Sequence, residues 1–137
     1  ELDLYGGWAG DFGQIGVDVG LYKYLYFADD NDVDFTEAYL GVSFGMFSAK
    51  ASFQIDGADI GNYYEAGADI PLGEDFTLAL HVGKYDYDVG DDPTDISVGV
   101  STEVAGLGLD ATYYDSDEDV YGSLGGGRFV VTVSKSM

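Results

Sequence analysis

The sequence contains no cysteine and only five lysine and arginine residues against 26 aspartates and glutamates, a formal net charge of −21. Without cysteine there is no disulfide and no thiolate chemistry. With so few basic residues the chain cannot neutralise phosphates, and nucleic acid is excluded as a partner. The single histidine, His81, is the only residue on which a histidine-based catalytic or metal site could depend.

Long apolar runs are also missing. No stretch approaches the roughly 20 residues of a transmembrane helix, so no helical span is expected. Strands of a membrane β-barrel need only about 9–11 residues of alternating pattern, which this composition allows. The 137 residues are enough for one domain, 1–137, and the 21 glycines and 12 tyrosines are unusual for a soluble one.

Apolar and polar residues alternate with a period of two along most of the chain. This period is typical of β-strands, because successive side chains leave a strand on opposite faces. No segment shows the period and caps of a helix. The prediction is an all-β fold, an antiparallel up-and-down meander of about nine strands. The predicted strands are 1–10, 14–27, 35–44, 47–55, 62–70, 76–87, 94–104, 107–115 and 128–137.

Short and long connections alternate between these segments. The short ones fall at 10–13, 45–46, 71–75 and 105–106, and the longer, acidic ones at 28–34, 56–61, 88–93 and 116–127. An up-and-down outer-membrane barrel sorts its connections in this way, with tight turns on the periplasmic side, whereas a Greek-key sandwich has no reason to do so. The pattern therefore favours an outer-membrane β-barrel whose apolar phase faces lipid over a soluble sandwich.

Nine strands do not fit a simple bacterial barrel, which has an even number of strands and both termini on the periplasmic side. The chain begins within a strand pattern at Glu1 and shows no signal peptide, so we expect a processed or truncated product. Either upstream strands complete a barrel of about twelve, or the assembly is not a simple monomeric barrel.

Four segments carry a resemblance to a known family: EAYLGVSFGMFSAK, YYEAGADIPLGEDFTLALHVGKYDYD, TDISVGVSTEVAGLGLDATYYDSD and the terminal GRFVVTVSKSM. In these the sequence resembles the C-terminal part of the proteobacterial Gcw_chp family, a set of secreted, predicted outer-membrane β-barrel proteins of unknown function. The resemblance implies location and fold, with a signal peptide and further strands upstream. It brings no catalytic residues, and no enzyme is expected. The family usually closes on an aromatic residue, whereas this chain ends in Met137.

If the polar phase lines a barrel interior, that interior is acidic. The ionisable residues of this phase are Glu1, Asp3, Asp18, Glu37, Glu65, Asp69, Asp95, Glu103 and Asp110, against Lys50 and Arg128. His81 lies on the same phase, where we expect it to form hydrogen bonds in the lumen. Rings of acids favour cations, which predicts a narrow cation-preferring passive channel. A solvated sandwich face, or a filled interior in which tyrosine packs on glycine, is the structural alternative.

Two acidic loops suggest a second kind of site. Their alternating carboxylates suit Ca²⁺, which takes about six to eight oxygen ligands, but neither has the glycine and distal glutamate of an EF-hand. A solvated loop is favoured over weak divalent-cation binding that also bridges lipopolysaccharide phosphates. The residues concerned are Asp30, Asp32 and Asp34 in one loop and Asp115, Asp117 and Asp119 in the other.

Three functional classes remain open. They are an outer-membrane channel in contact with lipid and lipopolysaccharide, a structural outer-membrane barrel without transport, and an extracellular β-protein. The last would self-associate through the unpaired strand edge at 1–10. Apart from weakly bound divalent cations, no cofactor is expected.

Overall fold

The structure, a computed structural model, describes residues 1–27, 33–58, 60–117, 122 and 125–135. Within these ranges the regular structure consists of strands, and none of the described residues belongs to a helix able to cross a membrane. The strands are β1 (Leu2–Phe12), β2 (Ile15–Leu25), β3 (Phe35–Phe44), β4 (Phe47–Gly57), β5 (Asn62–Leu72), β6 (Phe76–Asp86), β7 (Thr94–Val104), β8 (Leu107–Ser116) and β9 (Arg128–Ser134).

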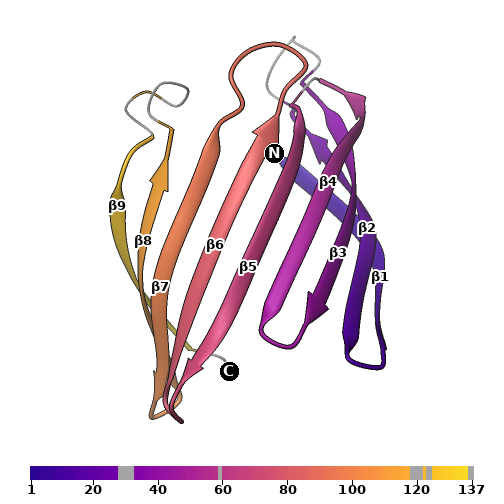
Figure 1. Cartoon of the computed structure of the whole chain (residues 1–137). Helices are drawn as coiled ribbons and strands as arrows, with labels where there is room; N and C mark the ends of the chain where they lie inside the picture. The colour runs from indigo at the N-terminus through magenta and orange to yellow at the C-terminus, as the bar shows by residue number, and fades with distance from the viewer. Residues whose placement is uncertain (28–32, 59, 118–121, 123–124, 136–137) are drawn as a thin grey trace.

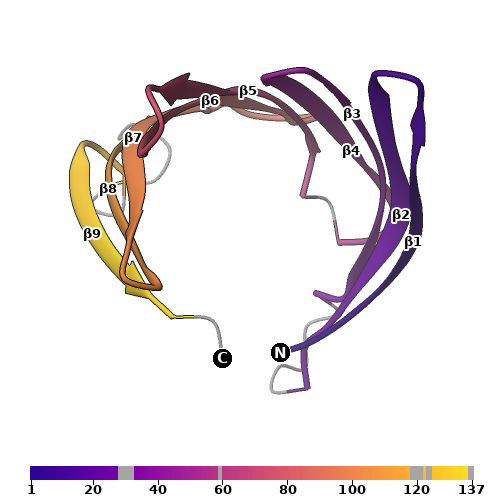
Figure 2. The same ribbon diagram turned by 90° about the horizontal axis from the view of Figure 1, so that it is seen from below.

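Each strand pairs with the next one in the chain, always antiparallel, so the nine strands form a single meander sheet. This confirms the all-β prediction and the strand count. The short turns lie together at one end of the sheet and the longer connections at the other (Figure 1). The sheet curls into an open ring but is not closed: among the described residues no pairing joins its edge strands β1 and β9 (Figure 2).

Four strands run further than the sequence pattern predicted, β4 to Gly57 and β8 to Ser116 among them. β1 continues to Phe12 and β5 continues through Pro71 to Leu72. Proline lacks the N–H of a ladder bond and is tolerated where no neighbour needs it. The Asp69 N–H points toward β4 and donates to the Met46 carbonyl. The backbone of residue 71, two positions further along, faces the same way but lies past the first residue of β4, where no ladder partner exists.

The ladder between β4 and β5 is the shortest in the sheet, with six paired residues against eleven between β5 and β6. Beyond Ser52 the two strands are joined through side chains instead. The Gln54 N–H donates to Asn62 Oδ1 at 3.2 Å, and Gln54 Oε1 accepts from the Ile60 N–H at 3.0 Å. The Thr36–Glu37 step of β3, opposite β4, carries a register shift.

The pairing register keeps the two phases of every strand apart. Apolar residues face apolar ones, as in Val19↔Leu40 and Leu80↔Val98, while Lys50 pairs with Glu65 on the other face. A slip of one residue would exchange the faces, so the pattern fixes the register. The apolar strand residues expected to face outward, such as Trp8, Val19 and Leu80, fall on the apolar face of this register.

In the part of the chain that the structure describes, no second layer covers the apolar face. Apart from Pro93, no apolar side chain among these residues is buried, and they form no hydrophobic core. Trp8 is 52% exposed, Val98 47% and Val131 65%, although all three belong to strands. The side chains that would fill the interior of a soluble domain therefore lie on the convex surface.

Candidate functional site

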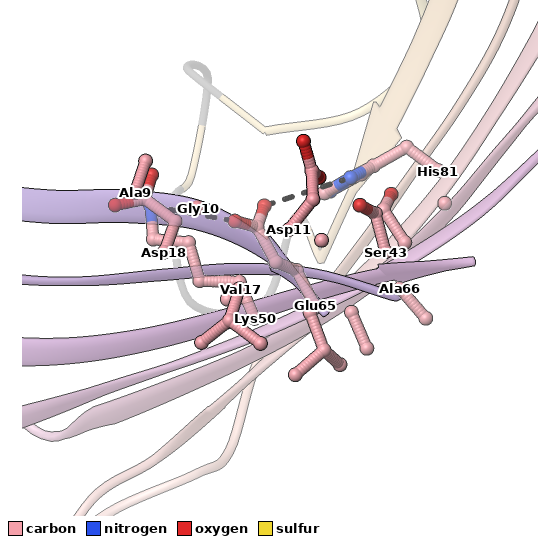
Figure 3. A pocket seen from close by; sticks show the side chains of 16 residues that line it. Ala9, Gly10, Asp11, Val17, Asp18, Ser43, Lys50, Glu65, Ala66 and His81 are labelled. Atoms are coloured by element: carbon pink, nitrogen blue, oxygen red, sulfur yellow. Dashed lines mark ion pairs between the residues drawn. The ribbon is translucent and has the colours of Figure 1, made fainter. Parts of the chain in front are cut away.

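The polar phases of β1–β6 line a cavity of about 570 Å³ (Figure 3). A cavity shared by six successive strands of a curled sheet lies on its concave side, so the polar face is the inner one. The ionisable groups of the lining are Asp11, Asp18, Lys50, Glu65 and His81. Glycine and serine supply much of the remaining lining, which leaves the charged groups room to move.

Glu65 connects the two basic groups of the cavity. Lys50 lies directly opposite it in the β4–β5 ladder, and the Lys50 Nζ is 3.5 Å from Glu65 Oε1. His81 lies diagonally across the β5–β6 ladder, with Nδ1 3.8 Å from Glu65 Oε2 (Figure 3). Such opposite and diagonal neighbours on one face are the pairs that contact each other in an antiparallel sheet.

A hydrogen-bonded network extends from His81 to the next strand. Its Nε2 lies 2.8 Å from Asp95 Oδ1 and 3.1 Å from the Tyr63 hydroxyl, which itself donates to Asp95 Oδ2 at 2.9 Å. Because a carboxylate only accepts, the partners assign the proton to Nε2. The Nδ1 edge faces Glu65, so the imidazole ring lies between two carboxylates.

The tyrosine rings on this face lie against the sheet over glycines. A Cβ on Gly20 would lie 2.7 Å from the Tyr39 ring, and one on Gly83 would overlap the Tyr63 hydroxyl. The Tyr39 hydroxyl donates to Asp18 Oδ1 at 3.0 Å. Glycine thus lets each ring lie along the wall, and the cavity stays open.

The remaining predicted lumen residues lie elsewhere on the same face. Glu37 pairs with Tyr22, and Asp69 with Ala79. Glu103 and Asp110 line a second cavity of about 450 Å³ near the short turns of β5–β8. The structure therefore brings Asp18, Lys50, Glu65 and His81 to one cavity, connects Asp95 to it through His81, and places Glu103 and Asp110 at another.

Asp11 is a cavity residue that the sequence pattern missed. The predicted strand ended at residue 10, and the glycines at 10 and 13 suggested a turn. In the structure Asp11 pairs with Gly16 on the polar phase, which places its carboxylate in the cavity. The available signal was the alternation itself, which continues to Phe12.

Two described acids of the long connections accept hydrogen bonds from backbone N–H groups at or next to strand ends. Asp34 Oδ1 accepts from the Tyr26 N–H at 2.7 Å, and Asp117 Oδ2 accepts from the Thr94 N–H at 2.7 Å. Asp115 lies in β8, opposite Ile96. No group of three or more acids and histidines in the described ranges is arranged to hold a metal ion. The other residues proposed for Ca²⁺, Asp30, Asp32 and Asp119, lie outside the described residues.

Asp92, between β6 and β7, also accepts a hydrogen bond from a backbone N–H group next to a strand end. Its Oδ1 accepts from the Tyr87 N–H at 3.2 Å, and its Oδ2 lies 3.3 Å from the Lys84 Nζ. The backbone hydrogen bond, with the nearby ammonium, lowers the pKa of Asp92 below its usual 3.8. The backbone contacts of Asp34, Asp92 and Asp117 therefore explain these three acids before any ligand is considered.

A family model described as a bacterial protein of unknown function (Gcw_chp) matches residues 1–137. The match covers the whole chain, so the expectation that only the C-terminal part of the family is represented is not borne out. No curated protein and no solved structure matches the chain.

Proposed function

The chain belongs to the Gcw_chp family, and from this premise and its two-faced sheet we propose an outer-membrane β-barrel protein acting as a narrow, cation-preferring passive channel. The observation that carries the proposal is the apolar convex face of a sheet whose described residues form no hydrophobic core. Burial of apolar surface is the dominant favourable contribution to folding, so a single layer needs an apolar environment to supply it. Lipid is the environment that fits.

The exposed area and the strand length support this environment. The accessible surface is 9443 Å², whereas the scaling for soluble monomers gives about 6,900 Å² for 14.6 kDa. Strands of 11 residues, such as β5 and β6, tilted by about 45° would climb roughly 26 Å, which matches an apolar band of about 25 Å.

The directions of the edge strands determine how many further strands a closed barrel would need. β1 and β9 are both odd-numbered strands of a meander and run the same way, so pairing them directly would be parallel. An all-antiparallel barrel needs an odd number of additional strands between them, as a total of about twelve would provide. Such a barrel is wider than an eight-stranded one filled by side chains and narrower than a sixteen-stranded aqueous pore.

The charge of the concave face supports a preference for cations. The nine acids predicted to face inward are joined by Asp11, whereas Lys50 and Arg128 are the basic residues of that phase in the described ranges. Rings of carboxylates set the sign of the permeant ion, and salt screens the effect.

The test uses the full-length protein. We expect it in the outer-membrane fraction, with heat-modifiable migration and, in planar bilayers under a salt gradient, a reversal potential of cationic sign. A Glu37→Gln, Glu65→Gln variant should lose part of that preference. Anion preference would refute the electrostatic argument, and membrane location without conductance would favour a structural barrel.

A second candidate is an extracellular self-assembling β-protein. The unpaired edges of β1 and β9 favour it, because exposed edges add strands from other chains. Sedimentation without detergent distinguishes the two. Soluble, concentration-dependent oligomers support self-assembly, whereas aggregation that only detergent or lipid prevents supports the membrane barrel.

A further inference from the structure

Lys50 places an ammonium group in the main cavity. It is the only lysine or arginine whose side chain lies on the concave phase of the described residues of β1–β6, since Lys23 and Lys84 lie on the opposite phase. Its Nζ is 3.5 Å from Glu65 Oε1 (Figure 3) and 5.4 Å from the centroid of the Tyr39 ring. An aromatic face beside a carboxylate is an arrangement that holds organic cations.

Lys50 leaves both space and excess negative charge in the cavity. Its side chain is 37% exposed, and the cavity of about 570 Å³ falls within the usual range for small-ligand sites. Asp11, Asp18 and Glu65 give three negative charges against one positive charge of Lys50, a balance of −2 with His81 neutral. The Tyr39–Asp18 hydrogen bond keeps a second carboxylate beside the same ring.

Further rings continue from the cavity toward the long connections. Tyr22 lies 5.1 Å from Tyr39 and 6.0 Å from Tyr24, and Tyr24 stacks on Phe35 at 4.3 Å. These residues share the polar phase of β2 and β3. An organic cation entering from that end would therefore meet successive ring faces before it reaches Glu65.

The geometry points to a site for linear primary amines between Tyr39, Asp18 and Glu65, in which Lys50 is a tethered occupant that an entering amine displaces. This inference rests on the proposed function, because it names the class of cation that the passage accepts. A primary ammonium can donate hydrogen bonds to the carboxylates beside the ring, whereas a quaternary ammonium donates none. The described residues offer no cluster for a metal ion.

The test is calorimetric titration of the full-length protein in detergent with cadaverine, and with tetramethylammonium and KCl at matched ionic strength. We expect saturable binding of cadaverine alone. Tyr39→Leu should weaken it by about 2- to 30-fold, the range of a cation–π contact, while Tyr39→Phe keeps the ring and most of the affinity. Lys50→Met should tighten it by roughly 1.5- to 5-fold, because the amine no longer competes with a partly exposed ion pair.

Amine binding that ignores Tyr39→Leu, or that weakens in Lys50→Met, would overturn the site. Heat-modifiable migration checks the fold of each variant, and the Lys50→Met result is independent of Tyr39. Bilayer measurements on the same samples separate the two proposals. Cation conductance without cadaverine binding would overturn the site alone, whereas ring-dependent binding without conductance would overturn the channel and support the site.

Discussion

The sharpest prediction compares arginine at two neighbouring positions of β7. Val98 lies near the middle of the strand on the convex face, 47% exposed, between Leu80 and Tyr113. Ser97 lies on the concave face, between His81 and Tyr114. If lipid covers the convex face, Val98→Arg places a charge in hydrocarbon and Ser97→Arg places it beside carboxylates.

The expected magnitudes differ widely. A lipid-facing arginine near the midplane of a barrel costs about 2–4 kcal/mol, which lowers the folding equilibrium constant roughly 30- to 700-fold. An arginine at a polar, partly exposed position should change the free energy of unfolding by less than about 1 kcal/mol. Only the membrane arrangement predicts this difference, because water on the convex face would solvate both arginines.

The measurement is urea-induced unfolding of the full-length protein in phospholipid vesicles, followed by tryptophan fluorescence. The wild type, Val98→Arg and Ser97→Arg are titrated from both the folded and the unfolded side, to establish equilibrium. Equal destabilisation by the two substitutions, or a larger effect at Ser97, would show that the convex face does not contact lipid.

Three further predictions concern single residues. Trp8, on the convex face, should be quenched by lipids with brominated acyl chains, and unchanged fluorescence would contradict contact with lipid. Ala105 has φ +54°, a left-handed conformation that glycine adopts more readily, so Ala105→Gly should stabilise the protein by up to about 1 kcal/mol in the same urea titration; destabilisation would contradict the turn geometry. The lowered pKa of Asp92 means that its stabilising contacts are complete above pH 3.8 and are lost as the pH falls through the lower folded-state pKa. The Tyr87 amide resonance should therefore titrate with a midpoint below 3.8 in the wild type and not in Asp92→Asn.

The strands were predictable because their signal is local. The alternation of apolar and polar residues can be seen in the sequence alone, and each strand's own residues show which of its positions belong to the apolar face. Errors occurred where turn-forming residues interrupted the signal. Gly10 and Gly13 suggested a turn and hid Asp11. Pro71 suggested the end of a strand, although β4 begins only at Phe47, opposite Ala68, and so leaves residue 71 of β5 without a ladder partner on that side.

The network at the cavity depends on register, which single strands do not reveal. Tyr63, His81 and Asp95 lie on three strands, and only their alignment brings the three polar groups within 3.1 Å of one another. Likewise, an acidic loop gives the same sequence signal whether its carboxylates bind an ion or cap a strand. The hydrogen bond from the Thr94 N–H to Asp117, 23 residues further along the chain, shows that this carboxylate caps a strand, and the sequence alone does not reveal this contact.

The short ladder between β4 and β5 makes the sheet mechanically uneven. With six paired residues, one fewer than the β8–β9 ladder, it has the fewest pairs to break, so we expect β1–β4 and β5–β9 to separate there first. The Lys50–Glu65 ion pair crosses this ladder at the level of the cavity. The interior of a barrel containing this ladder would therefore widen and narrow at β4 and β5. The group bound to the Glu65 carboxylate would determine how firmly these two strands are held together.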